Sequence, residues 1–587
     1  MRASTIHAFF ETAARQPERP AVRFRSSPGT WTSIRWSKYA TEVRRVARGL
    51  LSLGVKAGDR VAICGSNRFE WLLADLGALA AGAVPAPYYP TLPPDQAAYV
   101  IDHSEARVAI VEDAGQLAKI EKSRKLLPRL RQCVLMEGSA KGAISFADLQ
   151  RCAGAVTDRE IDERLAALTP ETLGTLIYTS GTTGRQKAVM ISHGNLLFSA
   201  EVAASILQTQ PGDVVVSYLP LSHIAEQMIS LHAAATSGYE VACCQHLEEL
   251  PATLREVRPT SFLGVPRVWE KIQAKIEAGV AAANPRRRAL FGWARRVGLE
   301  AARGHRTLLL PVARKLVHDR VRGALGLDRA RLLATSAAPI NRSTVEFFES
   351  LGMPLYEIYG QSECTGGTTS NLSGHRRLFS VGVALPGTEV KVAPDGEILL
   401  KGPHVFGGYY KDPGATAEAF TPDGFLRTGD VGELDRDGFL RITDRKKDLI
   451  ITSGGKNVSP QNIERLLAGI PGVAQAVVVG DARKHLAALF TLDPEAALRE
   501  AKACGSSCGT VEEIARDPRF VARIAEGVNA VNGELASFET IKRFHILPVE
   551  FTVESGELTP TMKVKRKIVG QRFAREIEEL FRDGAAA

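Results

Sequence analysis

The sequence lacks an apolar run long enough to cross a bilayer. Its most apolar stretch, LGALAAGAV from Leu76 to Val84, is about half the length of a membrane span and runs into Pro85. The first residues, MRASTIHAFFE, also lack the long apolar region of a secretory signal peptide. We therefore expect no transmembrane helix and no signal peptide, so that any contact with a membrane is peripheral.

Cysteines are few and poorly spaced for metal binding. Eight are scattered along the chain, with one adjacent pair, Cys243 and Cys244, and one CxxxC spacing, Cys504 and Cys508. Neither arrangement has good metal-ligand spacing, and a chain of 587 residues needs no disulfide framework. This cysteine usage is typical of a reducing compartment, so we expect a cytoplasmic location.

The chain carries no large excess of either charge. Its 74 Lys and Arg outnumber its 65 Asp and Glu by nine, which suits an anionic ligand or a membrane surface and does not demand nucleic acid. We expect no nucleic-acid partner. The excess is uneven, because arginines crowd one segment, at Arg286, Arg287, Arg288, Arg295, Arg296, Arg303, Arg306 and Arg314. A solvated helix face is the favoured interpretation of this segment, and a docking patch is the alternative.

The order of apolar runs predicts an α/β protein. From Glu171 onward, short β-rich runs such as TLIYT, VVVSYL, YEVACC and TSFLGV alternate with helical stretches. Strands separated by helices predict a parallel or mostly parallel sheet that binds ligands at the carboxyl ends of its strands. We expect TLIYT to end in a polar loop that leads into a helix over residues 193–208.

The pattern of predicted secondary structure changes in the second half of the chain. From about residue 270 to 330 the pattern becomes helical and Arg-rich, and we expect an insertion there. From about residue 380 the stretches APDGEILL and LDRDGFLRI each place an Asp-Gly turn between apolar runs, which predicts β-hairpins. The charge cluster TDRKKDLI then separates this region from a smaller αβ region, and we expect a hinge there.

A polar loop stands out in YTSGTTGRQK. The loop consists of residues that bury almost nothing apolar, namely Thr179, Ser180, Gly181, Thr182, Thr183 and Gly184. Such a turn lets main-chain N–H groups converge on an anion, while Lys187 adds positive charge. It is not the Walker A pattern, because two residues separate Gly184 from Lys187. On this motif alone, a phosphate loop and a plain flexible turn both stay open.

Three further motifs suit a nucleotide. In YGQSE, Tyr359 could stack on a purine, Ser362 could meet a phosphate, and Glu363 could hold Mg²⁺, which prefers one or two carboxylates plus phosphate oxygens. In RTGD, the Asp430 carboxylate could accept hydrogen bonds from both ribose hydroxyls. In GELTPTMKVKRK, Lys563 lies in a turn near the C-terminus. Each motif taken alone also fits a surface or turn residue without a ligand.

In this order the motifs resemble the adenylate-forming superfamily of acyl-CoA synthetases, luciferases and peptide-synthetase adenylation domains. The resemblance covers nearly the whole chain, through YTSGTTGRQK, SYLPLSHIAEQ, FLGVPRVWEKI, ATSAAPI, YGQSE, RTGD, TDRKKDLIITSGGKNVSP and GELTPTMKVKRK. The helical insertion after VPRVW, the GDARKHLAALF strand and the PTMK ending are similar to the bubblegum-like branch of long-chain fatty acyl-CoA synthetases. Gln186 and Ala188 depart from the family's usual Pro and Gly, and we expect altered nucleotide affinity or rate rather than lost chemistry.

The resemblance implies the fold class and its domains. We expect an α/β protein with a large N-terminal domain of mixed and parallel sheets with helices, a β-barrel-like subdomain, and a small mobile α+β C-terminal domain. The expected boundaries are an AMP-binding domain at residues 1–443, with the insertion at about 270–330 and the β-rich subdomain at about 380–443, a hinge at 444–449, and the C-terminal domain at 450–587. Within the hinge, Lys447 is expected to absorb the rotation of the C-terminal domain.

The resemblance also implies the reaction, which is ATP-dependent ligation of a long-chain fatty acid to coenzyme A through an acyl-adenylate, with release of AMP and pyrophosphate. Lys563 would bridge the carboxylate and the α-phosphate, Glu363 would hold Mg²⁺, and Lys187 with its loop would cradle the outer phosphates. Further nucleotide contacts are expected from Ala337, Ala338, Tyr359, Gly360, Gln361, Ser362, Asp430 and Arg445.

Two tunnels follow from the same resemblance. The acyl tunnel is expected to pass His223, Gly264, Trp269 and Ala337. A gate and a core aromatic are equally good interpretations of Trp269, and a structural role is the favoured interpretation of His223. The coenzyme A tunnel is expected to be lined by Ser453, Gly454, Gly455 and Lys456.

Two rival functions stay open. One is a fatty acyl-AMP ligase that passes its acyl group to a carrier protein, although no carrier-like segment follows the lysine motif. The other is a non-catalytic nucleotide- or lipid-binding scaffold. A homodimer and peripheral contact with a membrane are left open as partners.

Overall fold

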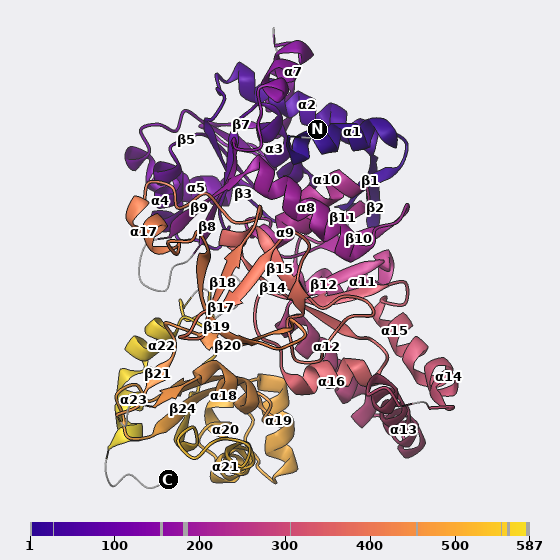
Figure 1. Cartoon of the computed structure of the whole chain (residues 1–587), viewed down its shortest axis with the longest axis vertical. Helices are drawn as coiled ribbons and strands as arrows, with labels where there is room; N and C mark the ends of the chain where they lie inside the picture. The colour runs from indigo at the N-terminus through magenta and orange to yellow at the C-terminus, as the bar shows by residue number, and fades with distance from the viewer. Residues whose placement is uncertain are drawn as a thin grey trace. The chain divides into compact units, whose positions relative to one another are not determined.

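The structure is a computed structural model whose chain forms two compact units (Figure 1). It describes residues 3–27, 29–152, 156–179, 186–305, 307–453, 456–552, 555–559 and 564–582. The first unit comprises residues 1–337, 347–390 and 400–426, and the second comprises residues 338–346, 391–399 and 427–587. The division at a hinge over residues 444–449 stays a prediction.

A five-stranded parallel sheet in the order β4-β3-β5-β6-β7 organises the start of the first unit. Alternate residues of β3 face opposite layers, as a strand requires. Val61 and Ile63 lie in an apolar cluster with α2 and α3, whereas Ala62 and Cys64 lie in a second cluster with α4 and α5. These elements are α1 (Thr5–Arg15), α2 (Trp36–Ser52), β3 (Arg60–Cys64), α3 (Phe69–Ala80), β4 (Val84–Pro87), α4 (Pro94–Ser104), β5 (Ala106–Val111), α5 (Ala114–Lys122), β6 (Gln132–Leu135) and β7 (Ala143–Ser145).

The apolar run that ends at Val84 belongs to this core. It passes from the buried end of α3 into β4. Among the described residues, no helix combines the length and the apolar character that a membrane span needs.

The polar loop connects the two strands of an antiparallel hairpin, β8 (Leu173–Thr179) and β9 (Lys187–Ser192). Thr179 pairs with Lys187 at the end of the hairpin. Strand β9, which lies between the loop and the helix that follows it, was not predicted from the sequence. Strand β9 intervenes because its Val189 and Ile191 are buried against the core as an extended chain. The predicted helix is confirmed as α8 (His193–Leu207), and a capping box at Ser192 starts it.

Two further sheets contain the other predicted strands of this unit. The runs VVVSYL, YEVACC and TSFLGV are confirmed as β10 (Val214–Ser217), β11 (Glu240–Cys243) and β12 (Ser261–Gly264). The first sheet has the order β10-β11-β1-β2, and the second has the order β12-β13-β14-β15-β16. Strands β12 to β14 are parallel, as predicted, and β14 to β16 are antiparallel. The remaining strands are β1 (Pro20–Ser27), β2 (Thr30–Arg35), β13 (Leu332–Thr335), β14 (Leu355–Gln361), β15 (Gly366–Ser370) and β16 (Val383–Ala384).

The predicted insertion is confirmed as helical, because all of its described secondary-structure elements between Pro266 and Leu325 are helices. A π-helical turn, Arg314–His318, joins α14 to α15. Its helices are α12 (Pro266–Ala281), α13 (Pro285–Ala302), α14 (Leu310–Ala313) and α15 (Asp319–Leu325).

The predicted Asp-Gly hairpins are confirmed in a four-stranded sheet, β17-β18-β19-β20, most of which belongs to the second unit. A smaller sheet, β23-β24-β25, follows, with apolar clusters on both of its faces. The fold class is thus confirmed as mixed α/β with a β-rich subdomain and a small α+β region. The strands are β17 (Glu389–Val392), β18 (Glu397–Lys401), β19 (Leu426–Leu434), β20 (Leu440–Arg445), β21 (Ile450–Ile451), β22 (Asn457–Val458), β23 (Val473–Val479), β24 (Leu486–Leu492) and β25 (Ile541–Ile546). The helices are α18 (Pro460–Leu467), α19 (Pro494–Ala503), α20 (Val511–Ile514), α21 (Pro518–Asn532), α22 (Arg566–Arg572) and α23 (Ala574–Phe581).

Candidate functional site

Helix α4 holds both ends of the polar loop. The Tyr99 hydroxyl donates a hydrogen bond of 3.0 Å to the main-chain carbonyl of Gln186, at the loop's C-terminal end. One turn along the helix, His103 Nδ1 lies 3.0 Å from the hydroxyl of Tyr178, which precedes the loop. The rings of Tyr99 and His103 stack with centroids 5.2 Å apart. Because Tyr99 and His103 are four residues apart, they share one face of α4. From this face they contact the chain on both sides of the polar loop, at Gln186 and at Tyr178.

Lys187 and Glu363 both contact one tyrosine, Tyr409. The Lys187 ammonium lies 4.8 Å from the centre of the Tyr409 ring. The Tyr409 hydroxyl donates a hydrogen bond of 2.8 Å to Glu363 Oε1. Burial, and then the Glu363 carboxylate, raises the pKa of the Tyr409 phenol, so the hydroxyl keeps its proton as a donor. A cation and a carboxylate are thus positioned by one side chain at the stem of the predicted phosphate loop.

The YGQSE motif lies at the end of β14. Tyr359 is buried, and the chain then makes a bulge against β15 between Tyr359 and Gly360. A Cβ at Gly360 would lie 1.6 Å from the Gly366 carbonyl oxygen, so only glycine fits there. Gln361 ends the strand, and Ser362 begins a short 3₁₀ turn that carries Glu363. The motif therefore presents Glu363 on a turn whose position a bulge determines.

Ala337 has a strained backbone. Its φ is +74°, a left-handed conformation that alanine rarely adopts. The preceding residue, Ser336, donates a hydrogen bond of 2.8 Å to the carbonyl of Ile358 and so ties the end of β13 to β14. Such strain is often found at ligand sites. The next residue, Ala338, belongs to the second unit.

Two of the predicted acyl-tunnel residues are in close contact. A Cβ at Gly264 would lie 2.5 Å from the indole nitrogen of Trp269, so the ring fills the space that glycine leaves. The same nitrogen donates hydrogen bonds of 3.0 Å to the Gly264 carbonyl and 3.2 Å to the Ala334 carbonyl. Trp269 is fully buried, which agrees with its interpretation as a core aromatic. A gating role stays a prediction.

His223 has a structural role at the start of a short helix. Its Nδ1 accepts a hydrogen bond of 3.2 Å from the main-chain N–H of Ala225, which caps α9 (Ile224–Gln227). Nearby, the buried Glu226 accepts a hydrogen bond of 3.1 Å from the main-chain N–H of Leu219. These bonds fix the loop that carries His223, in agreement with the structural interpretation. Its place in an acyl tunnel stays a prediction.

In the second unit, Asp430 and Arg445 are paired across two strands. They are direct partners in the register of β19 and β20, and Arg445 Nε lies 3.2 Å from Asp430 Oδ1. The Asp430 side chain is buried, whereas that of Arg445 is 43% exposed. A buried carboxylate oriented by an exposed guanidinium suits the recognition of two neighbouring hydroxyls.

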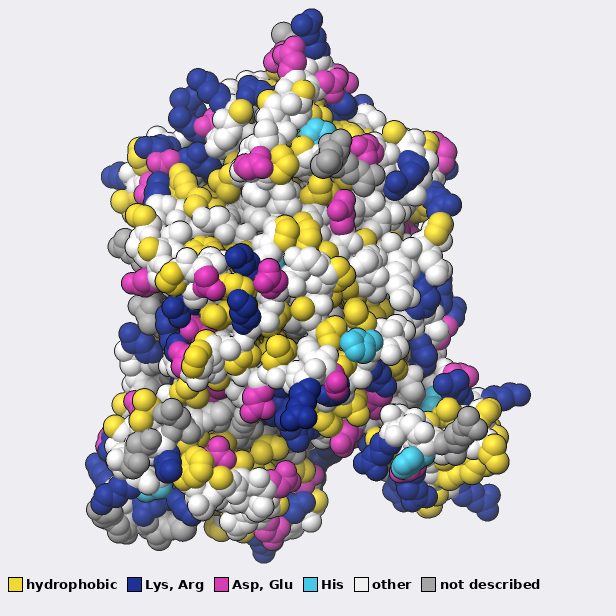
Figure 2. Space-filling view, in the orientation of Figure 1, with side chains coloured by type: hydrophobic (Ala, Val, Ile, Leu, Met, Phe, Trp, Pro, Cys, Tyr) yellow, Lys and Arg dark blue, Asp and Glu magenta, His cyan; other side chains and the backbone are white. Residues whose placement is uncertain are grey.

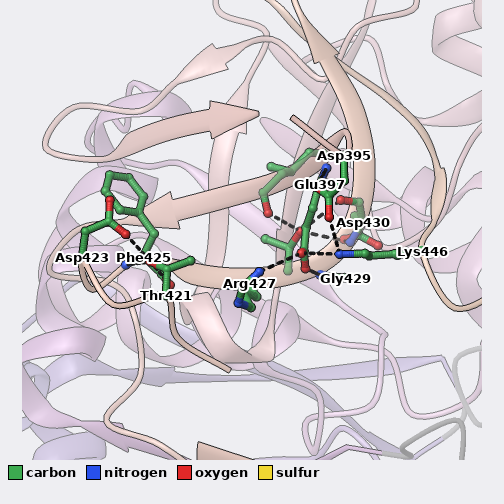
Figure 3. Close-up of polar contacts among 11 residues, drawn as sticks. Asp395, Glu397, Thr421, Asp423, Phe425, Arg427, Gly429, Asp430 and Lys446 are labelled. Atoms are coloured by element: carbon green, nitrogen blue, oxygen red, sulfur yellow. Dashed lines mark hydrogen bonds and ion pairs between the residues drawn. The ribbon is translucent and has the colours of Figure 1, made fainter. Parts of the chain in front are cut away.

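Within the predicted hinge, Lys446 forms ion pairs with two carboxylates. Figure 3 shows the Lys446 ammonium pointing at Asp395 and Glu397. Its nitrogen lies 2.7 Å from Asp395 Oδ2 and 2.9 Å from Glu397 Oε2. These hydrogen bonds, to Asp395 first, raise the pKa of Lys446. The next residue, Lys447, is exposed in a turn. The chain is therefore anchored on one side of Lys447.

The predicted coenzyme A residues lie only partly within the described chain. The Ser453 N–H donates a hydrogen bond of 2.9 Å to the Arg483 carbonyl. The main-chain N–H of the exposed Lys456 donates a hydrogen bond of 3.2 Å to the Thr452 hydroxyl oxygen. Predicted residues outside the described ones are Ser180, Gly181, Thr182, Thr183, Gly184, Gly454, Gly455 and Lys563.

An ion pair anchors the chain just after Lys563. Both terminal nitrogens of Arg566 lie 2.7 Å from the carboxylate oxygens of Glu464, and Arg566 also donates to the Val478 carbonyl. This bidentate pair attaches the start of α22 to α18 and β23. The segment that carries Lys563 thus has a fixed point three residues away.

The sequence motifs missed three residues of this site, namely Tyr409, Tyr99 and His103. Tyr409 lies in GGYYKDP, where two adjacent tyrosines follow two glycines in a loop and could have signalled a ring exposed to a ligand. Tyr99 and His103 show only a four-residue spacing, which carries no functional signal of its own. Within the described chain, no group of three or more His, Cys, Asp or Glu could hold a metal.

Comparison with known proteins identifies the family. A model of the AMP-binding enzyme family matches residues 9–410, and a model of the AMP-binding enzyme C-terminal domain matches residues 447–585. This chain belongs to the AMP-binding enzyme family. The resemblance found in the sequence motifs is thereby confirmed.

Curated relatives of this AMP-binding enzyme cover nearly its whole length. A long-chain-fatty-acid–CoA ligase of Mycobacterium bovis is 39% identical over 94% of this chain and 93% of its own. The bubblegum-type long-chain-fatty-acid–CoA ligase ACSBG2 of Xenopus laevis is 36% identical over 99% of this chain and 84% of its own. The branch predicted from the sequence is therefore confirmed.

Solved structures of low identity share the fold. ATP-bound MatB from Rhodopseudomonas palustris is 23% identical, with a TM-score of 0.72 over 98% of this chain and 99% of its own. The A domain of a carboxylic acid reductase from Segniliparus rugosus, in complex with AMP and a carboxylic acid, is 20% identical, with a TM-score of 0.75 over 99% of this chain and 94% of its own. Both confirm the fold class.

Proposed function

We propose that this AMP-binding enzyme joins a long-chain fatty acid to coenzyme A at the expense of ATP, through an acyl-adenylate, and releases AMP and pyrophosphate. Relatives that are 36 to 39% identical over nearly the whole chain are long-chain-fatty-acid–CoA ligases, which supports this reaction. The same relatives do not favour transfer to a carrier protein or a scaffold without activity.

The observation that carries the proposal is the arrangement around Tyr409. In adenylation a carboxylate attacks the α-phosphorus of ATP, so two anions must meet and a more highly charged centre must be stabilised. Lys187 would neutralise the outer phosphates from the stem of the loop. Glu363 accepts a hydrogen bond from the hydroxyl of the same tyrosine, and its carboxylate would bind the metal that accompanies ATP.

Glu363 fits a magnesium site. Mg²⁺ binds proteins through one or two carboxylates and takes its other ligands from phosphate oxygens and water. Glu363 supplies one carboxylate, and the Tyr409 hydroxyl orients it through Oε1. When bound, the ion would offset charge on the phosphates of ATP. Tyr359 would stack on the adenine, while Asp430 and Arg445 would hold the ribose.

Lys563 would complete the first half-reaction by bridging the fatty carboxylate and the α-phosphate. In the second half-reaction the thiol of coenzyme A attacks the acyl carbonyl, the bond to the phosphate oxygen breaks, and AMP leaves. Lys563 would have to withdraw for the thiol to enter. Rotation at Lys447 would achieve this and bring Ser453 and Lys456 to the thiol's path, because hinges absorb large dihedral changes in few residues.

The test is AMP release measured with a series of saturated fatty acids of graded length, with and without coenzyme A. We expect the highest kcat/KM with long chains and multiple turnovers only with coenzyme A. Activity confined to short acids would contradict the substrate, and multiple turnovers driven by a carrier protein but not by coenzyme A would contradict the acceptor.

We also propose that the protein is cytoplasmic and that it forms a homodimer. Sedimentation velocity at micromolar concentration would decide the oligomeric state, because a monomer and a dimer of a 63.4 kDa chain sediment at well-separated rates.

A further inference from the structure

The insertion carries the whole positive excess of the chain. Residues 285–325 contain eleven Lys and Arg but only two acidic residues, Glu300 and Asp319. The net charge of this segment is therefore +9, equal to the net charge of all 587 residues. Since the rest of the chain is neutral on balance, the excess is a local property of α13 to α15.

The same segment exposes an apolar stripe. Leu309, Val312 and Leu316 follow a spacing of three and four residues, and they are 51, 47 and 37% exposed. Leu308, which precedes them, is 96% exposed. Residues at this spacing share one face of a helix. The described chain therefore turns four large aliphatic side chains to solvent within nine residues, where a soluble surface normally exposes them singly.

The stripe is not a by-product of poor packing. The adjacent face of the same helical run packs inward, because Ala313 and Val317 are buried against Ala294 and Val297 of α13. His318 Nε2 also lies 3.1 Å from the Ala294 carbonyl. With one face used for the core, the second apolar face is left for a partner.

Basic side chains surround the stripe. Arg314, Lys315 and Arg320 are exposed on the same helical run, and Arg303 is exposed at the end of α13. Figure 2 shows hydrophobic and basic side chains gathered over the region labelled α13 and α14 in Figure 1, with little acidic surface among them. Exposed leucines framed by Lys and Arg are typical of helices that lie in the interface of an anionic bilayer.

We propose that α13 to α15 form a docking surface for an anionic lipid membrane, with Leu308, Leu309, Val312 and Leu316 inserted among the acyl chains. The positive charge is complementary to anionic headgroups, and the leucines are complementary to the layer beneath them. The proposed substrate gives a reason for such a surface, because a long-chain fatty acid partitions into bilayers. Only this last point rests on the proposed function.

A nucleic acid or an acidic protein would bind this surface through its positive charge and would not need the exposed aliphatic side chains. Binding to phosphates in a duplex needs Lys and Arg but buries few aliphatic side chains. The four exposed leucine and valine side chains therefore favour lipid. The two classes differ in a measurable way, because removal of the aliphatic side chains should leave a purely electrostatic partner bound.

The experiment is co-sedimentation of the full chain with vesicles of phosphatidylcholine alone and vesicles that also contain phosphatidylglycerol. One variant combines Leu308→Ser, Leu309→Ser and Val312→Ser, and a second combines Arg314→Glu with Lys315→Glu. The matched control combines Lys122→Glu with Leu126→Ser, two exposed side chains of a separate helical stretch. Circular dichroism confirms that each variant folds, and a DNA duplex serves as the rival anionic probe.

We expect the unchanged chain and the control to bind the anionic vesicles, and each of the two variants to bind them on the order of ten-fold more weakly. Added salt should weaken the binding without abolishing it. Equal binding of the aliphatic variant and the unchanged chain, or binding to the duplex but not to the vesicles, would overturn the proposal. Because vesicle binding needs no turnover, this result is independent of whether the proposed reaction is correct.

Discussion

The hydroxyl of Tyr99 donates a hydrogen bond of 3.0 Å to the carbonyl of Gln186, next to the lysine of the predicted phosphate loop. Gln186 replaces the proline that the family usually has there. A proline restricts the chain by its ring, whereas here a side chain from α4 holds the chain from outside. The bond thus gives this loop a different means of fixing the position of Lys187.

Tyr99→Phe should therefore weaken ATP binding. The loss of one hydrogen bond costs about 1 kcal/mol, so we expect KM for ATP to rise roughly five-fold with a smaller change in kcat. Steady-state kinetics with varied ATP measure the effect. Tyr89→Phe removes a hydroxyl from the same apolar cluster and serves as the control. An unchanged KM in Tyr99→Phe would show that the bond does not position the loop.

Gln186→Pro should act in the opposite direction. The proline keeps the carbonyl that Tyr99 binds and reduces the freedom of the loop before ATP arrives, an effect of about 0.4–1 kcal/mol. We expect KM for ATP to fall two- to five-fold by this energy, as roughly 1.4 kcal/mol corresponds to ten-fold. In the background of Tyr99→Phe the proline should restore most of the lost affinity. A higher KM in both backgrounds would contradict this account.

Substitutions of Tyr409 should separate its two contacts. Tyr409→Phe removes the hydrogen bond to Glu363 but keeps the ring beneath Lys187, so we expect a several-fold higher Mg²⁺ concentration for half-maximal activity. Tyr409→Leu removes the ring as well, and KM for ATP should then also rise, because a cation–π contact contributes about 0.5–2 kcal/mol. Titrations of Mg²⁺ at saturating ATP, and of ATP at saturating Mg²⁺, distinguish the two. Identical behaviour of both variants would show that the tyrosine acts only in packing.

The buried carboxyl of Asp75 should make stability depend on pH. Asp75 in α3 is 1% exposed, and burial raises its pKa from 3.8 to about 8. Between those pH values the folded state holds a proton that the unfolded state has released. Stability should therefore fall as pH rises, by up to about 1.4 kcal/mol per pH unit.

Asp75→Asn removes this titration, so its melting temperature relative to the unchanged chain should increase between pH 5 and about 8. Glu171→Gln, at an exposed position, should show no such trend. Thermal unfolding across this pH range measures the difference. Parallel curves for Asp75→Asn and the unchanged chain would mean that Asp75 is ionised in the folded protein.

Local signals in the sequence predicted much of the fold. The strands at residues 214–217 and 261–264 and the helix at 193–207 follow from runs of apolar residues and their flanking polar residues. Both Asp-Gly turns predicted hairpins, and the one at Asp437-Gly438 brings Asp430 opposite Arg445. The hairpin around the phosphate loop was not predicted, because its long polar connection lacks the short turn signature that identifies hairpins.

The sequence also did not predict the site contacts that join segments far apart in the chain. Tyr409 reaches Lys187 and Glu363 from a loop far along the chain, and Tyr99 reaches Gln186 from helix α4, 87 residues earlier in the sequence. A single sequence shows residue types and local spacing but not which surfaces face each other. The motifs therefore indicated Lys187 and Glu363, and the tyrosine that joins them needed the three-dimensional structure.

The proposed function rests on the role of Lys563 in the first half-reaction. The most direct test measures both half-reactions of Lys563→Ala, with Lys567→Ala at an exposed neighbouring position as the control. We predict that fatty-acid-dependent pyrophosphate release falls by a factor of about 10² or more, while transfer from preformed acyl-adenylate to coenzyme A continues near the normal rate. Equal loss of both half-reactions, or full pyrophosphate release without this lysine, would contradict the account.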